Sequence, residues 1–215
     1  MKTVGILGGM GSMATVDLFS KIVRYTKVTR DQDHLHIIID NYPQIPDRTD
    51  YILNRGIDPT EKMIEAAKRL EDAGADLIAM PCNTAHYFYE TIQASINVPI
   101  IHMMHETKKR LTDKVVLLAT QGTYQADLYK DVLTPNDTMK KDIMDLIYAY
   151  KKDQTIDVGL KEKILNQLDS THGIILGCTE LPLIFRQEDT HIPLIDPTQV
   201  LAEEIIIQAG AKLIN

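Results

Sequence analysis

Short apolar runs alternate with helix-forming segments along the whole chain, and this alternation limits the folds open to it. Consecutive parallel strands need a crossover helix between them, and a sheet covered by helices on both faces has apolar strands. The sequence therefore predicts an α/β fold built on parallel sheets. Seven runs are predicted strands, at residues 3–7, 36–39, 76–80, 100–103, 115–119, 173–176 and 193–195.

Two of the predicted helices have clear boundaries. Asp58 is a typical N-cap residue, Pro59 fits the first helical position, and Gly74 ends the same helix about four turns later. Pro197 begins a last helix that ends near Gly210. These signals are independent of the apolar pattern, and they agree with it.

The pattern of strands also repeats along the chain. The strand at 3–7 leads towards Cys82 and the strand at 115–119 leads towards Cys178, each starting with a glycine-containing turn. We therefore predict two similar Rossmann-like halves with a cleft between them. The first spans residues 1–104 and is completed by the C-terminal helix at 197–215, and the second spans residues 105–196.

The two cysteines occupy matching positions in this repeat. Cys82 and Cys178 each follow an apolar run and precede a segment that can open a helix. A thiol at such a turn faces free backbone N–H groups and the positive end of a helix dipole, which favours the thiolate. Two thiols placed alike predict an acid–base pair. Alternatives are two buried structural cysteines, a disulfide, or a metal site that uses Cys82 and His86, which lacks a second ligand pair.

Composition excludes several classes of protein. The net charge of −7, with no basic stripe, argues against a nucleic-acid partner. No apolar stretch reaches the roughly 18 residues that a membrane helix needs. The first residues run directly into a strand without a secretory signal, so we expect a cytoplasmic protein with reduced thiols.

A glycine-rich turn after the first strand offers a second interpretation. Residues 9–14 fit the pattern G-x-G-x-x-A, and Asp40 ends the second predicted strand as a ribose-binding acid does. An NAD-dependent oxidoreductase is therefore an alternative function. However, Asp40 lies further from the turn than the usual spacing of about 20 residues, and a nicotinamide cofactor would leave the paired cysteines unexplained.

Four motifs in a fixed order carry a resemblance to a known family. They are KTVGILGGMG at 2–11, NYPQIPDRT at 41–49, MPCNTAH at 80–86 and GCTE at 177–180. With these motifs the chain resembles the aspartate/glutamate racemases, and within them the aspartate racemase branch. Glutamate racemases of the cell-wall type usually have histidine where this chain has Glu180.

The resemblance implies a fold and a mechanism. Members have two α/β domains related by a pseudo-twofold axis, need neither pyridoxal phosphate nor metal, and are commonly dimers. One cysteine removes the α-proton from one face of the amino acid, and the other delivers a proton to the opposite face. The implied catalytic residues are Cys82 and Cys178, and the implied activity is interconversion of L- and D-aspartate.

The resemblance also implies substrate-binding residues. Arg48 is the expected partner of the distal carboxylate of a dicarboxylic substrate, and Lys152 is the expected second cation, with a shift by one residue to Lys151 as an alternative. The other expected residues border the substrate: Met10, Asn83, Thr84, Ala85 and Thr179. Helix capping is the structural alternative for the two threonines.

Two departures from the family pattern bear on these expectations. Ser12 and Met13 replace the usual Pro-Glu after the glycine turn, and we expect Ser12 to cap the helix. The segment 131–135 is too short for the additional strand that relatives carry there. Glutamate, a broader set of amino acids, or a protein that binds amino acids without catalysis are therefore alternatives to an aspartate racemase.

Overall fold

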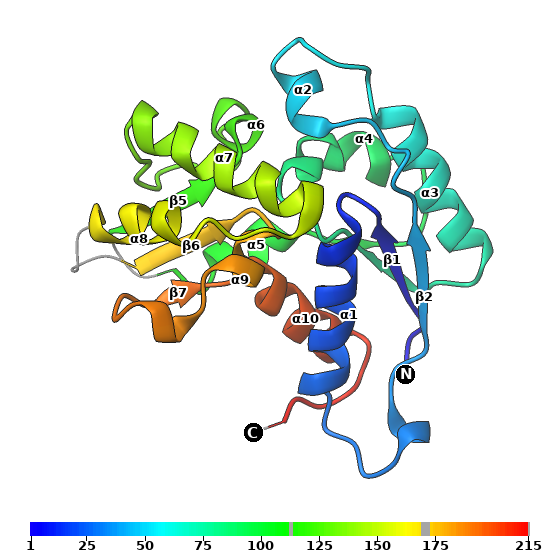
Figure 1. The fold of residues 1–215 in the computed structure, drawn as a ribbon. Coiled ribbons are helices and arrows are strands. Elements are labelled where there is room, and N and C mark those ends of the chain that lie inside the picture. Colours follow the sequence, from blue (N-terminus) through cyan, green and yellow to red (C-terminus); the bar gives the residue numbers. More distant parts are fainter. Residues whose placement is uncertain (112–113, 169–172, 215) are drawn as a thin grey trace.

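The computed structural model describes residues 1–111, 114–168 and 173–214, and it contains two parallel sheets (Figure 1). The first has the strand order β2–β1–β3–β4, formed by β1 (Val4–Gly8), β2 (Ile37–Asn41), β3 (Leu77–Ala79) and β4 (Ile100–Ile101). The second has the order β5–β6–β7, formed by β5 (Val115–Ala119), β6 (Gly173–Gly177) and β7 (Leu194–Ile195). The predicted α/β fold with two parallel-sheet halves is confirmed.

Helices connect the strands and cover both sheets. The α-helices are α1 (Ser12–Tyr25), α2 (Arg48–Ile52), α3 (Thr60–Asp72), α4 (Tyr89–Gln93), α5 (Met103–Lys108), α6 (Gln121–Gln125), α7 (Asp137–Asp153), α8 (Val158–Asn166), α9 (Leu181–Ile184) and α10 (Pro197–Gln208). The short 3₁₀ turns are η1 (Asp31–Asp33), η2 (Thr84–Phe88) and η3 (Gln187–Asp189). None of the helices in the described parts of the chain combines the length and the apolar character that crossing a membrane requires.

The predicted helix boundaries agree with the structure in most places. Asp58 accepts a hydrogen bond from the backbone N–H of Thr60 at 2.8 Å, and Gly74 follows α3 with a left-handed φ of +91°. Two expectations are wrong. The strand predicted at 100–103 ends at Ile101, because Met103 already begins α5. Ser12 is the first residue of α1 and does not cap it, and its hydroxyl accepts a hydrogen bond from Asn41.

The central strands of each sheet are buried on both faces, as the continuous apolar strands predict, whereas the edge strand β2 is partly exposed. In β1, Ile6 packs in a cluster with α1 and α10, whereas Leu7 packs in the opposite cluster with α3. In the second sheet, Leu118 packs with α7 and α8, and Leu117 faces the other side. The side chains that remain at the carboxyl ends of the strands are therefore the ones open to a ligand.

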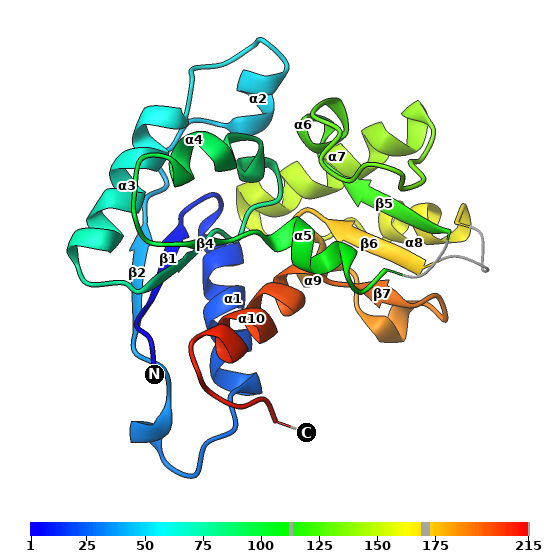
Figure 2. The same cartoon turned by 180° about the vertical axis from the view of Figure 1, so that it is seen from behind.

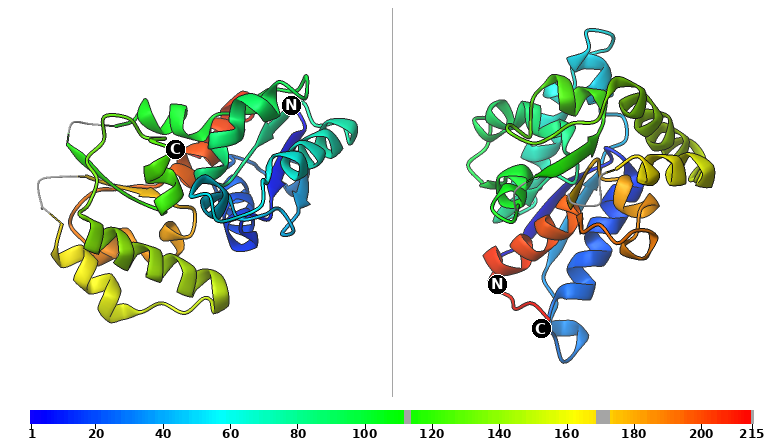
Figure 3. Two further views of the ribbon diagram at one scale, coloured as in Figure 1. Left: turned by 90° about the horizontal axis from the view of Figure 1, so that it is seen from above. Right: turned by 90° about the vertical axis from the view of Figure 1, so that its left-hand side faces the viewer.

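The chain passes from the first sheet to the second through α5 and returns with α10 (Figure 2). Seen from above, the two sheets lie side by side (Figure 3). Leu201 and Ile205 of α10 are buried in the same cluster as Leu18 of α1. At the start of α10, Asp196 forms an ion pair with Lys21 of α1 at 2.6 Å. The C-terminal helix thus packs on the first half, while the exact boundary at residue 104 stays a prediction.

The free edge of β5 shows what the short segment at 131–135 does. Leu133 forms a single parallel bridge beside Val116, with hydrogen bonds to Val115 and Leu117 at 3.2 and 2.8 Å. Further along, the Tyr124 hydroxyl donates to the carbonyl of Leu117 and accepts from the N–H of Ala119. One bridge and one tyrosine hydroxyl therefore satisfy backbone groups that a further strand would otherwise pair.

Candidate active site

Both cysteines lie at the carboxyl end of a central strand and line one small cavity between the two halves. Cys82 follows β3 after two residues, and Cys178 follows β6 directly. We call this space the inner cavity. Its volume is about 10 Å³, which is room for about one water molecule. The residues that line it are Met10, Asp47, Arg48, Thr49, Cys82, Asn83, Thr84, Thr120, Lys151, Cys178, Thr179 and Glu180.

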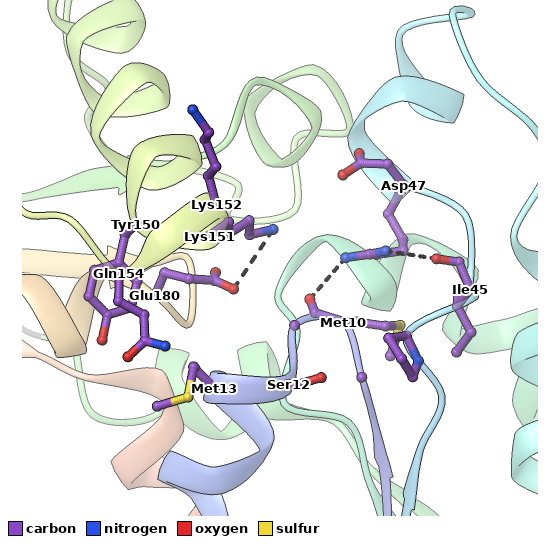
Figure 4. Close-up of a pocket in the computed structure, with 14 residues that line it drawn as sticks. Met10, Ser12, Met13, Ile45, Asp47, Tyr150, Lys151, Lys152, Gln154 and Glu180 are labelled. Atoms are coloured by element: carbon purple, nitrogen blue, oxygen red, sulfur yellow. Dashed lines mark hydrogen bonds and ion pairs between the residues drawn. The ribbon is translucent and has the colours of Figure 1, made fainter.

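A larger and more open cleft of about 440 Å³ adjoins the inner cavity (Figure 4). We call it the outer cleft. It includes the glycine turn with Ser12 and Met13, the two residues that depart from the family pattern. The outer cleft and the inner cavity share Met10, Asp47, Arg48, Lys151 and Glu180. These shared side chains stand between the two spaces, so a ligand that passes from the cleft to the cysteines must move some of them.

Cys178 is held in its protonated form. Its thiol donates a hydrogen bond to Oε2 of Glu180 at 2.9 Å, and Oε1 of Glu180 lies 3.8 Å from Nζ of Lys151. Burial raises the pKa of the Cys178 thiol well above its usual value, and the negative charge of Glu180 raises it further. Lys151 opposes this effect without cancelling it. Cys178 is therefore a proton donor at rest. In the sequence, Glu180 is a difference between subfamilies, and its position alone does not indicate a contact with the thiol.

Cys82 has a different environment. Nδ1 of His86 lies 2.8 Å from the Cys82 carbonyl, and Nε2 of His86 accepts the backbone N–H of Met103 at 3.2 Å. Because Nε2 is the acceptor, Nδ1 carries the proton and donates to Cys82. Burial lowers the pKa of His86 to about 4, so the ring is neutral and this arrangement is fixed. The buried His86 therefore holds the backbone of the turn that carries Cys82.

Arg48 is the cation next to Cys82. It is the first residue of α2 and is 6% exposed. Its Nη atoms donate to the carbonyls of Met10 at 2.9 Å and Pro46 at 3.0 Å, and Nε has no hydrogen-bond partner among the described residues. Burial alone would lower the pKa of Arg48, but the nearby Cys82 and Asp47 raise it. Arg48 therefore both closes the glycine turn and supplies positive charge to the inner cavity.

Neutral donors surround the cysteines. Asn83 and Thr84 follow Cys82, and Thr179 follows Cys178, and all three line the inner cavity. Neither threonine is a helix N-cap. The Thr84 hydroxyl lies 3.0 Å from those of Thr120 and Thr123, so it also joins the two halves.

Two expected residues lie elsewhere. Ala85 is fully buried in the apolar cluster of the first half and belongs, within the described chain, to neither the inner cavity nor the outer cleft. Lys152 is exposed and lines the outer cleft, whereas Lys151 lines both spaces and faces Glu180 (Figure 4). The second cation at the inner cavity, besides Arg48, is thus Lys151, one residue before the expected one. The sequence alone does not show which of the two neighbouring lysines lines the inner cavity.

The glycine turn accepts a hydrogen bond from Arg48 at the Met10 carbonyl and lies directly against the loop that contains Tyr42. Gly9 has a φ of +88°, and a Cβ there would meet the backbone of Tyr42 at 2.5 Å.

Asp40, the residue suited to a ribose, forms an ion pair with Arg69 at 2.8 Å instead. Within the described residues, no three histidine, cysteine, aspartate or glutamate side chains are grouped so that they could hold a metal ion.

Comparisons with known proteins give one consistent result. The model of the Asp/Glu/Hydantoin racemase family matches residues 7–205. The broad specificity amino-acid racemase RacX of Bacillus subtilis (strain 168) is 33% identical, over 94% of this chain and 96% of that protein. Among solved structures, the aspartate racemase of Picrophilus torridus is 29% identical with a TM-score of 0.84, over 100% of this chain and 96% of that one. An aspartate racemase homologue from Pyrococcus horikoshii OT3 is 28% identical with a TM-score of 0.75, over 97% and 99%.

Proposed function

The chain belongs to the Asp/Glu/hydantoin racemase family and is an amino-acid racemase, and from this premise we propose that Cys82 and Cys178 are its two acid–base residues. The observation that carries the proposal is that both thiols line one cavity but face different charges. Cys178 faces a carboxylate and keeps its proton, whereas Cys82 lies beside the cation Arg48. The two thiols thus have opposite charges beside them, and a two-base racemisation requires one proton donor and one proton acceptor.

In the proposed reaction, the Cys82 thiolate takes the α-proton from one face of the amino acid. The carbon then carries excess electron density, which spreads into the α-carboxylate. Cys178 delivers its proton to the opposite face, and the roles of the two thiols are reversed in the other direction. Asn83, Thr84 and Thr179 are the proposed donors to the α-carboxylate, which they bind in the substrate and continue to bind while charge develops on it.

Aspartate, the substrate expected from the sequence, stays a proposal. The structures of an aspartate racemase and of an aspartate racemase homologue are similar to this chain, and Arg48 and Lys151 provide positive charge near the cysteines. Arg48 and Lys151 are the proposed partners of the distal carboxylate, with Lys151 in place of Lys152. A homodimer stays a prediction from the resemblance, and a cytoplasmic location stays a prediction from the sequence.

A second candidate, a racemase for amino acids with uncharged side chains, is favoured by the balance of charge. The charged side chains that line the inner cavity are two cations, Arg48 and Lys151, and two carboxylates, Asp47 and Glu180, and the Cys82 thiolate of the proposed reaction adds one negative charge. Lys151 is paired with Glu180, and the Nη atoms of Arg48 are engaged by backbone carbonyls. A zwitterion with an uncharged side chain leaves the net charge unchanged, whereas aspartate adds a further negative charge. Similarity to a broad specificity amino-acid racemase is consistent with substrates other than aspartate.

Exchange of the α-proton tests both proposals at once. L-Aspartate and L-asparagine, which are nearly equal in shape and differ in charge, are incubated separately with the enzyme in D₂O, with the α-proton followed by proton NMR and the D-isomer by chiral chromatography. Loss of the α-proton signal together with growth of the D-isomer supports racemisation, and the faster substrate identifies the class. Exchange of neither substrate, nor of any other amino acid in a panel, would contradict racemisation.

A further inference from the structure

Tyr129 joins the two halves at the active site. It belongs to the second half, just before the shortened segment, and is 3% exposed. Its hydroxyl donates to Oδ1 of Asn83 at 2.5 Å, and Asn83 is the residue that follows Cys82 in the first half. Asn83 is itself 2% exposed and lines the inner cavity, which Tyr129 does not reach. A side chain outside the cavity thus contacts one that borders it.

The direction of this hydrogen bond fixes the Asn83 amide. Oδ1 of Asn83 faces the Tyr129 hydroxyl, which keeps its proton because burial raises the pKa of Tyr129, so the hydroxyl donates to this oxygen. The amide oxygen is then the acceptor, and the NH₂ group is the part left over. Nδ2 of Asn83 is buried and has no hydrogen-bond partner among the described residues. A buried donor without a partner is costly, and a ligand oxygen would remove that cost.

We propose that Tyr129 is a positioning residue, which orients Asn83 so that its NH₂ group donates to the substrate carboxylate. This inference rests on the proposed function, in which Asn83 borders the α-carboxylate. If the amide were turned by half a rotation, its oxygen would face the carboxylate and repel it. Because Tyr129 and Asn83 come from different halves, Asn83 is correctly oriented when the two halves are packed together.

The test compares two tyrosine-to-phenylalanine variants. In Tyr129→Phe the Asn83 amide loses its anchor, and we expect KM for the preferred amino acid to rise about tenfold while kcat changes much less, as for lost ground-state binding. Tyr124→Phe is the matched control, because it also removes a hydroxyl with hydrogen bonds, here a partly buried one, but those bonds go to the backbone of β5. Tyr124→Phe should lower the melting temperature and leave KM unchanged. Equal KM values for wild type and Tyr129→Phe would overturn the inference.

A double-mutant cycle separates positioning from a general structural effect. In an Asn83→Ala background, Tyr129→Phe should have no further effect on KM, since the group it orients is gone. An effect of the same size with and without Asn83 would refute the proposed role.

The side-chain NH₂ signal of Asn83 in ¹⁵N-edited NMR gives a readout that does not depend on turnover. In wild type we expect a distinct NH₂ pair, which Tyr129→Phe shifts or broadens and Tyr124→Phe leaves in place. If wild type exchanged no amino acid, the proposed function would fail, and an Asn83 signal unaffected by Tyr129→Phe would separately overturn the orientation.

Discussion

The two halves of the molecule share one arrangement of parallel strands and helices, but the sheet of the second half has fewer strands. β3 and β6 are the strands that lead to Cys82 and Cys178, and each pairs with the first strand of its half. The first half adds β2 at the outer edge of β1, whereas the second half has the single bridge at Leu133 in that place. The loss of a strand at the edge leaves the central strands and their cysteines in position, because the site is built at the carboxyl ends of central strands.

The surroundings of the two thiols differ more than the backbones do. Cys82 has Arg48 beside it and a neutral His86 behind its carbonyl. Cys178 has Glu180 on its sulfur, with Lys151 on the far side of that carboxylate. The repeated backbone unit thus places two thiols at one cavity. Burial and the charge of Glu180 keep the proton on one of them, Cys178.

The largest expected effect comes from removing either thiol. Cys82→Ala and Cys178→Ala should each lower the rate of racemisation by at least about 10³-fold, because each deletes one of the two proton-transfer groups. The rate of formation of the opposite enantiomer, measured by chiral chromatography from both the L- and the D-substrate, checks this. A single variant with near-normal turnover in both directions would mean that the two cysteines are not a matched pair.

A smaller effect separates the two neighbouring lysines. Lys151→Met leaves Glu180 without its cation and adds a net negative charge to the inner cavity, so we expect kcat/KM to fall by about 10- to 100-fold. Lys152→Met is the matched control, since Lys152 is exposed at the outer cleft. Its kcat/KM should change by less than about threefold, as for a surface charge. The reverse order would restore Lys152 as the second cation.

The sequence was sufficient for the fold because local and global signals agree in it. Apolar runs, Asp58 before α3 and Gly74 after it all indicate the elements that the structure contains. Errors occurred at ends such as Met103, where an apolar residue suits a strand as well as a helix. The single bridge at Leu133 could not be predicted, since pairing at an edge depends on distant backbone groups.

The sequence predicts the two cysteines of the candidate site but not the side-chain contacts around them. Motifs located Cys82 and Cys178, and the structure brings both to one cavity. The residues missed were those that act through long-range contacts, such as Tyr129 on Asn83, or through a side chain's direction, such as Lys151. Glu180 was visible two residues after Cys178, but that spacing alone does not reveal a hydrogen bond to the sulfur.

The smallest expected effect comes from a substitution beside Cys178 that changes a charge and almost no volume, and it tests how far the two thiols differ. Glu180→Gln removes the negative charge beside Cys178, so the pKa of this thiol should fall towards its usual value, although burial still keeps it raised. The proton needed for delivery is then lost at lower pH, and the alkaline limb of the pH profile of kcat/KM should move to lower pH.

The rate of alkylation of Cys178 by iodoacetamide should show the same shift when it is measured in a Cys82→Ala background. In wild type, a raised thiol pKa in the folded state means that the free energy of unfolding falls as pH rises from the usual thiol pKa through the folded one. Glu180→Gln should reduce that fall, because it brings the two pKa values closer together. If neither the alkaline limb nor the alkylation curve moved, burial alone would set the proton on Cys178, and the two thiols would differ less than their neighbours indicate.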